Sequence, residues 1–467
     1  MKSLLLFLSL VVLLSTASAS FKPWTNHGGN NWNQRYVNND PAITASRINL
    51  ISTAWVFNTN DSVSAVVTVE ENVVYAVDWG GWIYAINNNN GFLLWKRNVS
   101  TITGKTADLS RAAPVITDTL VCSGSQSTET GEGGAIVYCL NKLTGATVFA
   151  TQVHEHEQSI VTQSGTAYDG YLYVGTASHE EAASVNPLYD CCSFDGRFHK
   201  IRLSDGVLVG SISMLQGLPI GPGNYSGNGV WGSSPSIDKK RNAIYIGTGN
   251  NYDVPQYVTD CFDNAAGGST DHCIEPGNYI DSIISIDLET FTINWATKVQ
   301  GYDAWVVPCL FGGANCPDSP GPDYDFGAAP MYIKGEESTT SSSSDEIDND
   351  DDDFTPSHPY KGDRLIIGQK SGAIYCLDPD DGDIVWVTQG GPGGTLGGHN
   401  WGGSTDRENS YFNELNWSNL NYTLSPGITV INGSAWVKVR NNDGGIEWTT
   451  PVPDEGGVSV AAGPTFV

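Results

Sequence analysis

The stretch Tyr375–Trp386, YCLDPDDGDIVW, decides the fold, because five weaker copies of it recur along the 467-residue chain. Each copy has a short apolar run, a turn rich in Asn, Asp and Gly, and a second run that in most copies ends in an aromatic residue. This pattern predicts a β-hairpin with a tight turn. The other copies span residues 84–95, 138–149, 199–210, 284–295 and 436–448.

Hairpins that recur at long, roughly regular intervals indicate a radial repeat, because one such unit cannot bury its own apolar face. The 53 glycines, the 14 tryptophans and the scarcity of long helical patterns also favour an all-β chain. We therefore expect an all-β propeller. A set of unrelated hairpins in an all-β protein is the alternative.

A sorting signal is visible at the start of the chain. Lys2 is followed by an apolar run from Leu4 to Leu14 and by small residues up to Ser20, which predicts a signal peptide over residues 1–19. The run is too short to span a bilayer, and no later segment approaches 20 apolar residues. We expect an exported protein without a membrane span, secreted or, in a bacterium, periplasmic, whose residues 20–467 form the propeller domain.

The charge of the chain excludes one class of partner. A formal net charge of −28 disfavours binding to nucleic acid or to anionic membranes. Residues 336–357 contain much of the acidic excess in a Ser- and Asp-rich tract, which predicts a disordered loop insertion. Calcium buffering by this tract is the alternative. Six glycosylation sequons, used only in a eukaryotic secretory host, begin at Asn60, Asn98, Asn224, Asn416, Asn421 and Asn432.

Nine cysteines suit an oxidising compartment. Two pairs are close enough in sequence to staple loops, a third pair lies on successive predicted strands, and Cys376 is expected to be a buried free thiol. Sequence alone leaves the connectivity open. The three pairs are Cys261 with Cys273, Cys309 with Cys316, and Cys122 with Cys139.

Several segments between the repeats fall at predicted strand ends, where a propeller gathers residues around its axis. Their order closely resembles that of the pyrroloquinoline-quinone (PQQ) dependent alcohol dehydrogenases, and most closely the polyvinyl alcohol dehydrogenase-like group. The resemblance runs from about Trp24 to the end of the chain. It is carried by the segments WGGW (79–82), IVTQ (160–163), GTASHEE (175–181), GVWGSSP (229–235), GTGNNYD (247–253), DAW (303–305), GPDYDFG (321–327), GQKSG (368–372) and GGHNWGG (397–403).

The resemblance implies a Ca²⁺ ion coordinated to a quinone in the propeller axis. The glutamate ligand of the family falls on Glu180, with Glu181 as the alternative, and the asparagine ligand falls on Asn250, with Asn251 as the alternative. Carboxylate and amide oxygens are what this hard cation needs. Without the resemblance, the two glutamates would be interpreted as a solvated pair and Asn250 as a turn residue.

The resemblance also implies a catalytic aspartate. Asp325, in Tyr324-Asp-Phe326, occupies that position and would be the general base that takes the alcohol proton as hydride leaves for the quinone. Asp323 would face the other way along an extended segment. Lanthanide-using relatives carry a second aspartate where this chain has Gly327, so the chain resembles the calcium type.

PQQ is a flat tricarboxylate, so its site needs cations, donors and an aromatic surface. By the motifs of the family, Arg111, Thr162 and Lys370 would bind its polar edge and Trp231 would stack on one face. Cys191 and Cys192 are candidates for the vicinal disulfide that caps PQQ in methanol dehydrogenases. They follow Glu180, whereas the family's pair precedes the arginine matched by Arg111, so structural or unpaired cysteines are an equal alternative.

These residues predict a secreted, PQQ- and Ca²⁺-dependent dehydrogenase of secondary alcohols, polyols or polymer hydroxyls. The chain has no Cys-x-x-Cys-His, so we expect no haem and a separate cytochrome or quinone-type electron acceptor. Propellers of the family have eight blades, whereas six repeats are present here, which predicts a fragment, closure in trans, or a C-terminally truncated product. A non-catalytic propeller that binds a partner or glycan is the second hypothesis, and a redox-inactive truncation product is the third.

Overall fold

The computed structural model describes residues 22–37, 43–44, 46–127, 134–265, 267–335, 362–427 and 429–453. The predicted signal peptide, residues 1–19, and the predicted acidic loop, residues 336–357, lie outside them. The described chain is mostly strand and connecting loop, which confirms the all-β class. Its helices are short: α1 (Val99–Thr103), α2 (Glu180–Ala183), α3 (Gln256–Asn264), and the 3₁₀ helices η1 (Ile48–Leu50), η2 (Asp271–Cys273) and η3 (Val307–Leu310).

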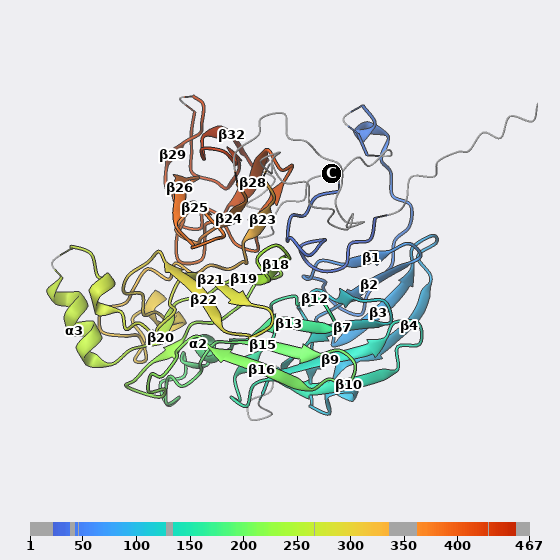
Figure 1. Ribbon diagram of the computed structural model, residues 1–467, viewed down its shortest axis with the longest axis horizontal. Helices are drawn as coiled ribbons and strands as arrows, with labels where there is room; N and C mark the ends of the chain where they lie inside the picture. The colour runs from blue at the N-terminus through green and yellow to red at the C-terminus, as the bar shows by residue number, and fades with distance from the viewer. Residues whose placement is uncertain are drawn as a thin grey trace, which may run out of the picture.

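In the described part of the chain, six four-stranded antiparallel sheets follow one another in chain order, and α3 projects at one edge (Figure 1). The first three sheets are β1 (Thr68–Glu70), β2 (Val73–Val77), β3 (Trp82–Asn87) and β4 (Leu93–Asn98); β6 (Val115–Ile116), β7 (Leu120–Gly124), β9 (Ile136–Asn141) and β10 (Thr147–Gln152); β12 (Thr166–Tyr168), β13 (Tyr171–Gly175), β15 (Arg197–Arg202) and β16 (Leu208–Ser213). The next three are β18 (Ser236–Asp238), β19 (Ala243–Gly247), β21 (Ser282–Asp287) and β22 (Ile293–Lys298); β23 (Met331–Ile333), β24 (Arg364–Gly368), β25 (Ala373–Leu377) and β26 (Ile384–Gln389); β27 (Ser404–Thr405), β28 (Asn409–Glu414), β31 (Ala435–Arg440) and β32 (Ile446–Pro451).

Four two-stranded ribbons connect or flank these sheets in the described chain. They are β5 (Asp108–Leu109) with β8 (Gln126–Ser127), β11 (Ser159–Ile160) with β14 (Ala177–Ser178), β17 (Ser226–Gly227) with β20 (Asn251–Asp253), and β29 (Tyr422–Thr423) with β30 (Val430–Ile431).

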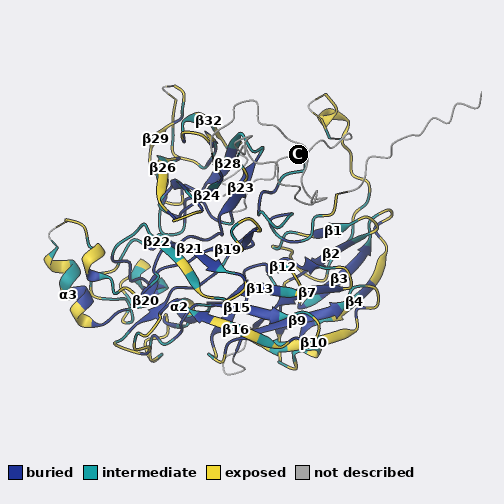
Figure 2. Cartoon of the chain, in the orientation of Figure 1, coloured by how far each residue is buried: buried dark blue, intermediate teal, exposed yellow. Residues whose placement is uncertain are grey.

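All six predicted hairpins are confirmed, and each is formed by the third and fourth strands of one sheet. The third strand is largely buried, whereas the fourth is exposed along much of its length (Figure 2). Buried side chains of one sheet pack against those of the next: Cys122 and Cys139 of the second sheet lie in one apolar cluster with Val174 and Ile201 of the third. The core therefore lies between neighbouring sheets.

The aromatic residue that ends a repeat packs on the glycine in the turn of the next repeat. Trp95 lies against Gly145 and donates its indole N–H to the carbonyl of Lys142 at 3.0 Å. A Cβ on Gly145, which has a φ of +67°, would lie 2.8 Å from the Trp95 ring, so the turn needs glycine for its backbone and for this approach. We call this contact between an aromatic ring and a turn glycine of neighbouring sheets a joint. The same joint pairs Phe149 with Gly206, Trp295 with Gly382, and Trp386 with Gly444.

One joint has its two residues exchanged. The third repeat ends in Gly210 where the others have an aromatic residue, and the fourth repeat has Phe291 where the others have the turn glycine. Phe291 packs over Gly210, at which a Cβ would lie 2.4 Å from its ring. Phe291 keeps the left-handed backbone of the turn, with a φ of +54°. The contact between the two sheets is thus preserved with its partners reversed.

Residues 24–35, which we call the hub segment, touch the first strand of every one of the six sheets in order. Their backbone carbonyls accept hydrogen bonds from the backbone N–H groups of five of these strands, and Asn26 donates to the sixth. The partners are Val69 (β1), Ile116 (β6), Thr166 (β12), Ile237 (β18), Tyr332 (β23) and Thr405 (β27). The sheets therefore radiate from one short segment, as in a propeller.

The predicted disulfides Cys122–Cys139, Cys261–Cys273 and Cys309–Cys316 are present, Cys191 is bonded to Cys192, and Cys376 is a buried free thiol. Among the helices in the described part of the chain, none is both long enough and apolar enough to cross a membrane.

The exchanged joint yields a double-mutant test. Phe291→Gly loses ring packing, and Gly210→Phe crowds the ring that is already there, so each single variant should lower the free energy of unfolding by about 1–3 kcal/mol. The double variant rebuilds the joint of the other sheets and should recover at least about 1 kcal/mol of the summed loss, as measured by urea denaturation. If the double variant instead lost the full sum of the two single-variant losses in free energy of unfolding, the claim that Gly210 and Phe291 compensate each other would be contradicted.

Candidate active site

Asp325 lies at the centre of the predicted site residues and is 3% exposed. Its Oδ1 accepts the backbone N–H of Asn250 at 2.6 Å. Its Oδ2 accepts the indole N–H of Trp231 at 3.2 Å and a hydrogen bond from Lys370 Nζ at 2.8 Å. Four residues that the sequence assigned to base, metal and cofactor roles therefore meet at one carboxylate, although they come from four separate segments of the chain.

Lys370 is buried and forms a second ion pair, with Asp323 Oδ1 at 2.8 Å. Burial alone would lower the pKa of Lys370, but the charges of Asp323 and Asp325 outweigh it and raise the pKa above its usual value. The ammonium also lies 5.5 Å from the centre of the Trp231 ring. The prediction that Asp323 faces away from the site is wrong: its backbone is in the left-handed region, with a φ of +60°, and its side chain lies beside Asp325 on Lys370.

Glu181, Asp303, Asp323 and Asp325 form what we call the carboxylate cluster. Burial, and then the charge of Asp325, raise the pKa of Glu181 to about 8. Burial is also the main cause that raises the pKa of Asp303 to about 6 and that of Asp323 well above its usual range. The cluster thus carries more potential negative charge than Lys370 balances, which favours protons or a bound cation.

Glu180 and Glu181 point to different surroundings. Glu180 is fully buried, and its carboxylate accepts the backbone N–H groups of Ser193 and Phe194 at 2.7 and 2.8 Å and the hydroxyl of Tyr189 at 3.0 Å. Burial would raise the pKa of Glu180, but hydrogen bonds from His156 and these backbone groups hold it below its usual value. Glu180 anchors a loop, whereas Glu181 faces the charges of Asp325 and Lys370.

The two asparagines of the predicted metal turn also differ. The side-chain amide of Asn250 donates to the carbonyls of Asn251 and Trp305, both at 2.9 Å, so its Oδ1 is the atom suited to a cation. The side chain of Asn251 is engaged on both atoms by Asn228 and Asn278, at 2.7 and 2.8 Å. The geometry favours Asn250 over its neighbour.

Arg111 lies between two indole rings, 5.6 Å from the centre of Trp79 and 5.3 Å from that of Trp401. Trp401 in turn meets Trp231 edge to face at 5.3 Å, which joins Arg111 to the surroundings of Asp325. Burial lowers the pKa of Arg111, and no carboxylate lies within ion-pair distance of it among the described residues. Arg111 is therefore a partly buried cation, which suits an anionic ligand.

Three buried polar atoms in the segments that carry the family resemblance have no hydrogen-bond partner in the described chain: Thr162 Oγ1, His179 Nε2 and Asn400 Oδ1. Buried polar groups are rarely left unpaired, so these atoms are suited to a polar ligand or an ordered water. Thr162 was predicted from the sequence. Asn400 and His179 were not, although both lie in segments that carried the family resemblance.

The Cys191–Cys192 pair lies on the Glu180 side of the site. Cys192 is buried against Phe194, Tyr252 and Val306, and the backbone that follows it binds the Glu180 carboxylate. The charges of Glu181 and Asp325 act on Tyr252, whose pKa is raised well above its usual value mainly by burial. Whether this disulfide covers a cofactor stays a prediction.

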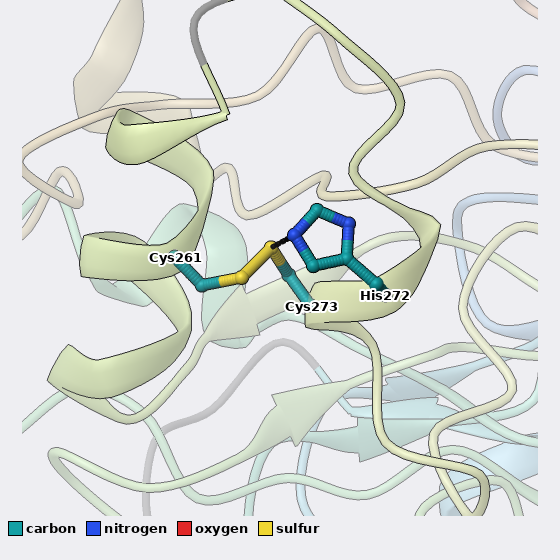
Figure 3. A group of neighbouring side chains, drawn as sticks. All are labelled: Cys261, His272 and Cys273. Carbon is teal, nitrogen blue, oxygen red and sulfur yellow. Dashed lines mark hydrogen bonds between the residues drawn. A yellow bond between two sulfur atoms is a disulfide. The ribbon is translucent and has the colours of Figure 1, made fainter.

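A second group of possible metal ligands lies away from these residues. Cys261, His272 and Cys273 approach one another beside α3 (Figure 3), but the two cysteines are bonded to each other and so offer no thiolate. In the disulfide form this group is a staple between α3 and η2.

A family model described as "Outer membrane protein assembly factor BamB", which represents PQQ-type repeats, matches residues 51–308, more than half of the chain. The fold and this match define a PQQ-type propeller. The chain belongs to the family of PQQ-type repeat propellers that this model represents.

Two curated relatives place the resemblance more closely. The chain is 25% identical over 447 residues to a polyvinylalcohol dehydrogenase from Pseudomonas sp. and 27% identical over 406 residues to one from Sphingopyxis sp.. The alignments cover 92% and 84% of this chain but 59% and 53% of the relatives, so the chain spans little more than half their length. They confirm the sequence resemblance to the PQQ-dependent alcohol dehydrogenases.

Solved structures support the same fold. The quinohemoprotein alcohol dehydrogenase from Pseudomonas putida superposes with a TM-score of 0.62 at 14% identity over 92% of this chain and 66% of its own. The enzyme from Comamonas testosteroni gives 0.61 at 15% identity over 95% and 74%.

The carboxylate cluster predicts a pH dependence for the metal-free protein. Because the pKa of Glu181 rises from 4.5 to about 8 on folding, the folded state binds more protons than the unfolded state between these values. The free energy of unfolding should therefore fall as the pH rises through this window. Urea denaturation at about pH 5, 6.5 and 8 in the presence of a chelator measures this, and Glu181→Gln should flatten the dependence. An unchanged slope in the variant would contradict the assignment.

Proposed function

We propose that the chain is the catalytic propeller of a PQQ- and Ca²⁺-dependent dehydrogenase that oxidises secondary hydroxyl groups of an alcohol, polyol or polymer. The observation that carries the proposal is the set of contacts on Asp325, which joins Asn250, Trp231 and Lys370 at one buried carboxylate. The names of the curated relatives support the same reaction class.

The residues present fit both groups. Arg111 and Lys370 offer two cations to a tricarboxylate, the unpartnered atoms of Thr162 and Asn400 offer hydrogen bonds, and Trp231 offers a flat surface. This set is what PQQ requires.

A cation fits at the carboxylate cluster. Asn250 Oδ1, Asp325 and a glutamate would supply oxygen ligands, which suits Ca²⁺. We assign the glutamate to Glu181, the alternative to Glu180 in the sequence, because Glu180 is occupied with the loop 189–194. When bound, PQQ supplies the hydride acceptor and Ca²⁺ polarises it as a Lewis acid.

The protein's own contribution is a fixed, buried base. Asp325 would accept the hydroxyl proton of the alcohol while Lys370 Nζ and Trp231 Nε1 hold its Oδ2 in place. Its 3% exposure keeps bulk water from competing for the proton. Lys370 also keeps Asp323 from moving away, because the ammonium bridges the two carboxylates.

An apolar rim beside the site supports a substrate with a hydrocarbon backbone. The loop after α2 and the helix η3 with its following residue expose Val185, Leu188, Leu310 and Phe311, which are 45%, 90%, 53% and 63% exposed. Asn315 ties the two segments together by donating to the carbonyls of Ser184 and Asn186 at 2.9 and 3.1 Å. A polymer that alternates methylene and hydroxyl-bearing carbons fits such a rim.

Export, a separate cytochrome or quinone-type electron acceptor, and the eight-bladed ring of the family complete the proposal for the whole protein. The six four-stranded sheets of the described chain would be six of those blades.

Replacing the base tests the reaction. The protein reconstituted with PQQ and Ca²⁺ should reduce a dye in the presence of 2-butanol or polyvinyl alcohol. Asp325→Asn should lower kcat by about 10²–10⁴-fold, because it removes the proton acceptor. Asp260→Asn, on the exposed face of α3, is the matched control and should keep wild-type kcat. Wild-type kcat in Asp325→Asn would refute the assigned base.

Replacing a cation tests cofactor binding without catalysis. Arg111→Gln should weaken PQQ binding by about 10–100-fold in a calorimetric titration, because one charge-assisted contact is lost. Arg97→Gln is the control, since Arg97 lies on the outer strand β4 and donates hydrogen bonds to the backbone carbonyls of Lys96, Thr144 and Gly145. Equal affinity of all three proteins would place PQQ elsewhere, and no uptake by the wild type would favour the non-catalytic propeller.

A further inference from the structure

Asp303 connects the loop that carries Asp325 with the turn that carries Asn250, and the sequence assigned it no role. It is 1% exposed, and its two carboxylate oxygens accept consecutive backbone N–H groups, that of Asp323 at 2.9 Å and that of Tyr324 at 2.7 Å. These amides lie immediately before Asp325. One side chain therefore fixes the direction from which the chain enters the proposed base.

The backbone of the loop bound by Asp303 needs such an anchor. Asp323 has a φ of +60°, a conformation that costs a non-glycine residue about 1–2 kcal/mol. Gly321 lets the loop come close, since a Cβ there would lie 2.3 Å from Asp303 Oδ1. The loop is thus bent around the Asp303 carboxylate.

The backbone around Asp303 holds the other half of the site. Its carbonyl accepts the N–H of Asn251 at 3.0 Å, and Trp305 N–H returns a hydrogen bond to the Asn251 carbonyl at 2.9 Å. The Trp305 carbonyl also accepts the side chain of Asn250 at 2.9 Å. Residues 303–305 therefore hold the turn that carries Asn250, while the Asp303 side chain holds the loop that carries Asp325.

We propose that Asp303 is a positioning residue, which sets the placement of Asp325 relative to Asn250 by binding the amides of residues 323 and 324. This inference rests on the proposed function, in which Asp325 is the base and Asn250 a metal ligand. Asp303 itself touches neither substrate nor cofactor in this account.

The test compares Asp303→Asn with Asp253→Asn in the full chain. In Asp303→Asn, the new side-chain amide would direct its own N–H donors at one of the two backbone N–H groups, which should release the loop. Asp253 is the matched control, because its two oxygens also each accept one backbone N–H, from Gly223 and Val254, both at 2.9 Å.

Hydrogen exchange of the peptide spanning residues 321–326 is measured in the protein without PQQ. Exchange should be at least about 10-fold faster in Asp303→Asn than in the wild type and unchanged in Asp253→Asn. In the reconstituted proteins, kcat of Asp303→Asn should fall by up to about 100-fold, with PQQ affinity and the KM for 2-butanol within about 3-fold of wild type.

The outcomes separate the two claims. Wild-type exchange in Asp303→Asn, or full kcat despite faster exchange, would overturn the positioning role while leaving the proposed function in place. The same loss of kcat in both variants would also overturn it, because the effect would be general destabilisation. A wild-type protein that binds PQQ but shows no alcohol oxidation would instead overturn the proposed function.

Discussion

The backbone hydrogen bonds of the hub segment are the constraint on which the rest of the structure depends. Twelve consecutive residues, 24–35, meet the first strand of each of six sheets in chain order. Neighbouring sheets are then joined at their outer hairpins by an aromatic ring on a turn glycine. The hydrogen bonds of the hub segment fix the position of the first strand of each sheet. The contacts between aromatic rings and turn glycines fix how each sheet packs against the next. Loops that leave the strands are thereby brought together, which is how residues as distant as Asn250, Asp325 and Lys370 meet.

The electrostatics of the site follow from this convergence. Four acidic side chains are crowded in a largely buried space around Lys370, and burial raises the pKa of three of them, Glu181, Asp303 and Asp323. Such crowding of negative charge disfavours the folded state unless protons or a cation neutralise it, and we propose that a cation ligated by Glu181 and Asp325 does so. The partly buried Arg111, which packs on Trp401, carries a positive charge that a bound anion would balance. A tricarboxylate quinone beside a divalent cation satisfies both.

The sequence predicted those features that depend on local chemistry. Five of the six hairpins follow from an Asx residue and a turn glycine a few positions apart, as in Asn141 and Gly145, whose backbone groups bond at 2.8 Å. The disulfides between neighbouring cysteines follow from chain proximity. The exchange of Gly210 and Phe291 was visible as two irregular repeats, but only the structure shows that the irregularities compensate each other.

Other features leave no pattern in the sequence. The hub segment acts mainly through backbone groups, so its side chains show no period. Glu180 and Glu181 have the same chemistry, and the short helix α2 decides which of them faces Asp325. Asp323 was expected to point away because extended backbone alternates, but its left-handed φ turns it toward Lys370. Asp303 acts on a loop twenty residues away in sequence, and no spacing rule connects the two.

A crystal structure of the protein grown with PQQ and Ca²⁺ tests the central claim most directly. The account predicts quinone density over the Trp231 ring with its carboxylates toward Arg111, and an ion bound by Glu181, Asn250 Oδ1 and Asp325. An empty site at saturating PQQ, or a quinone bound away from Trp231 and Asp325, would contradict it.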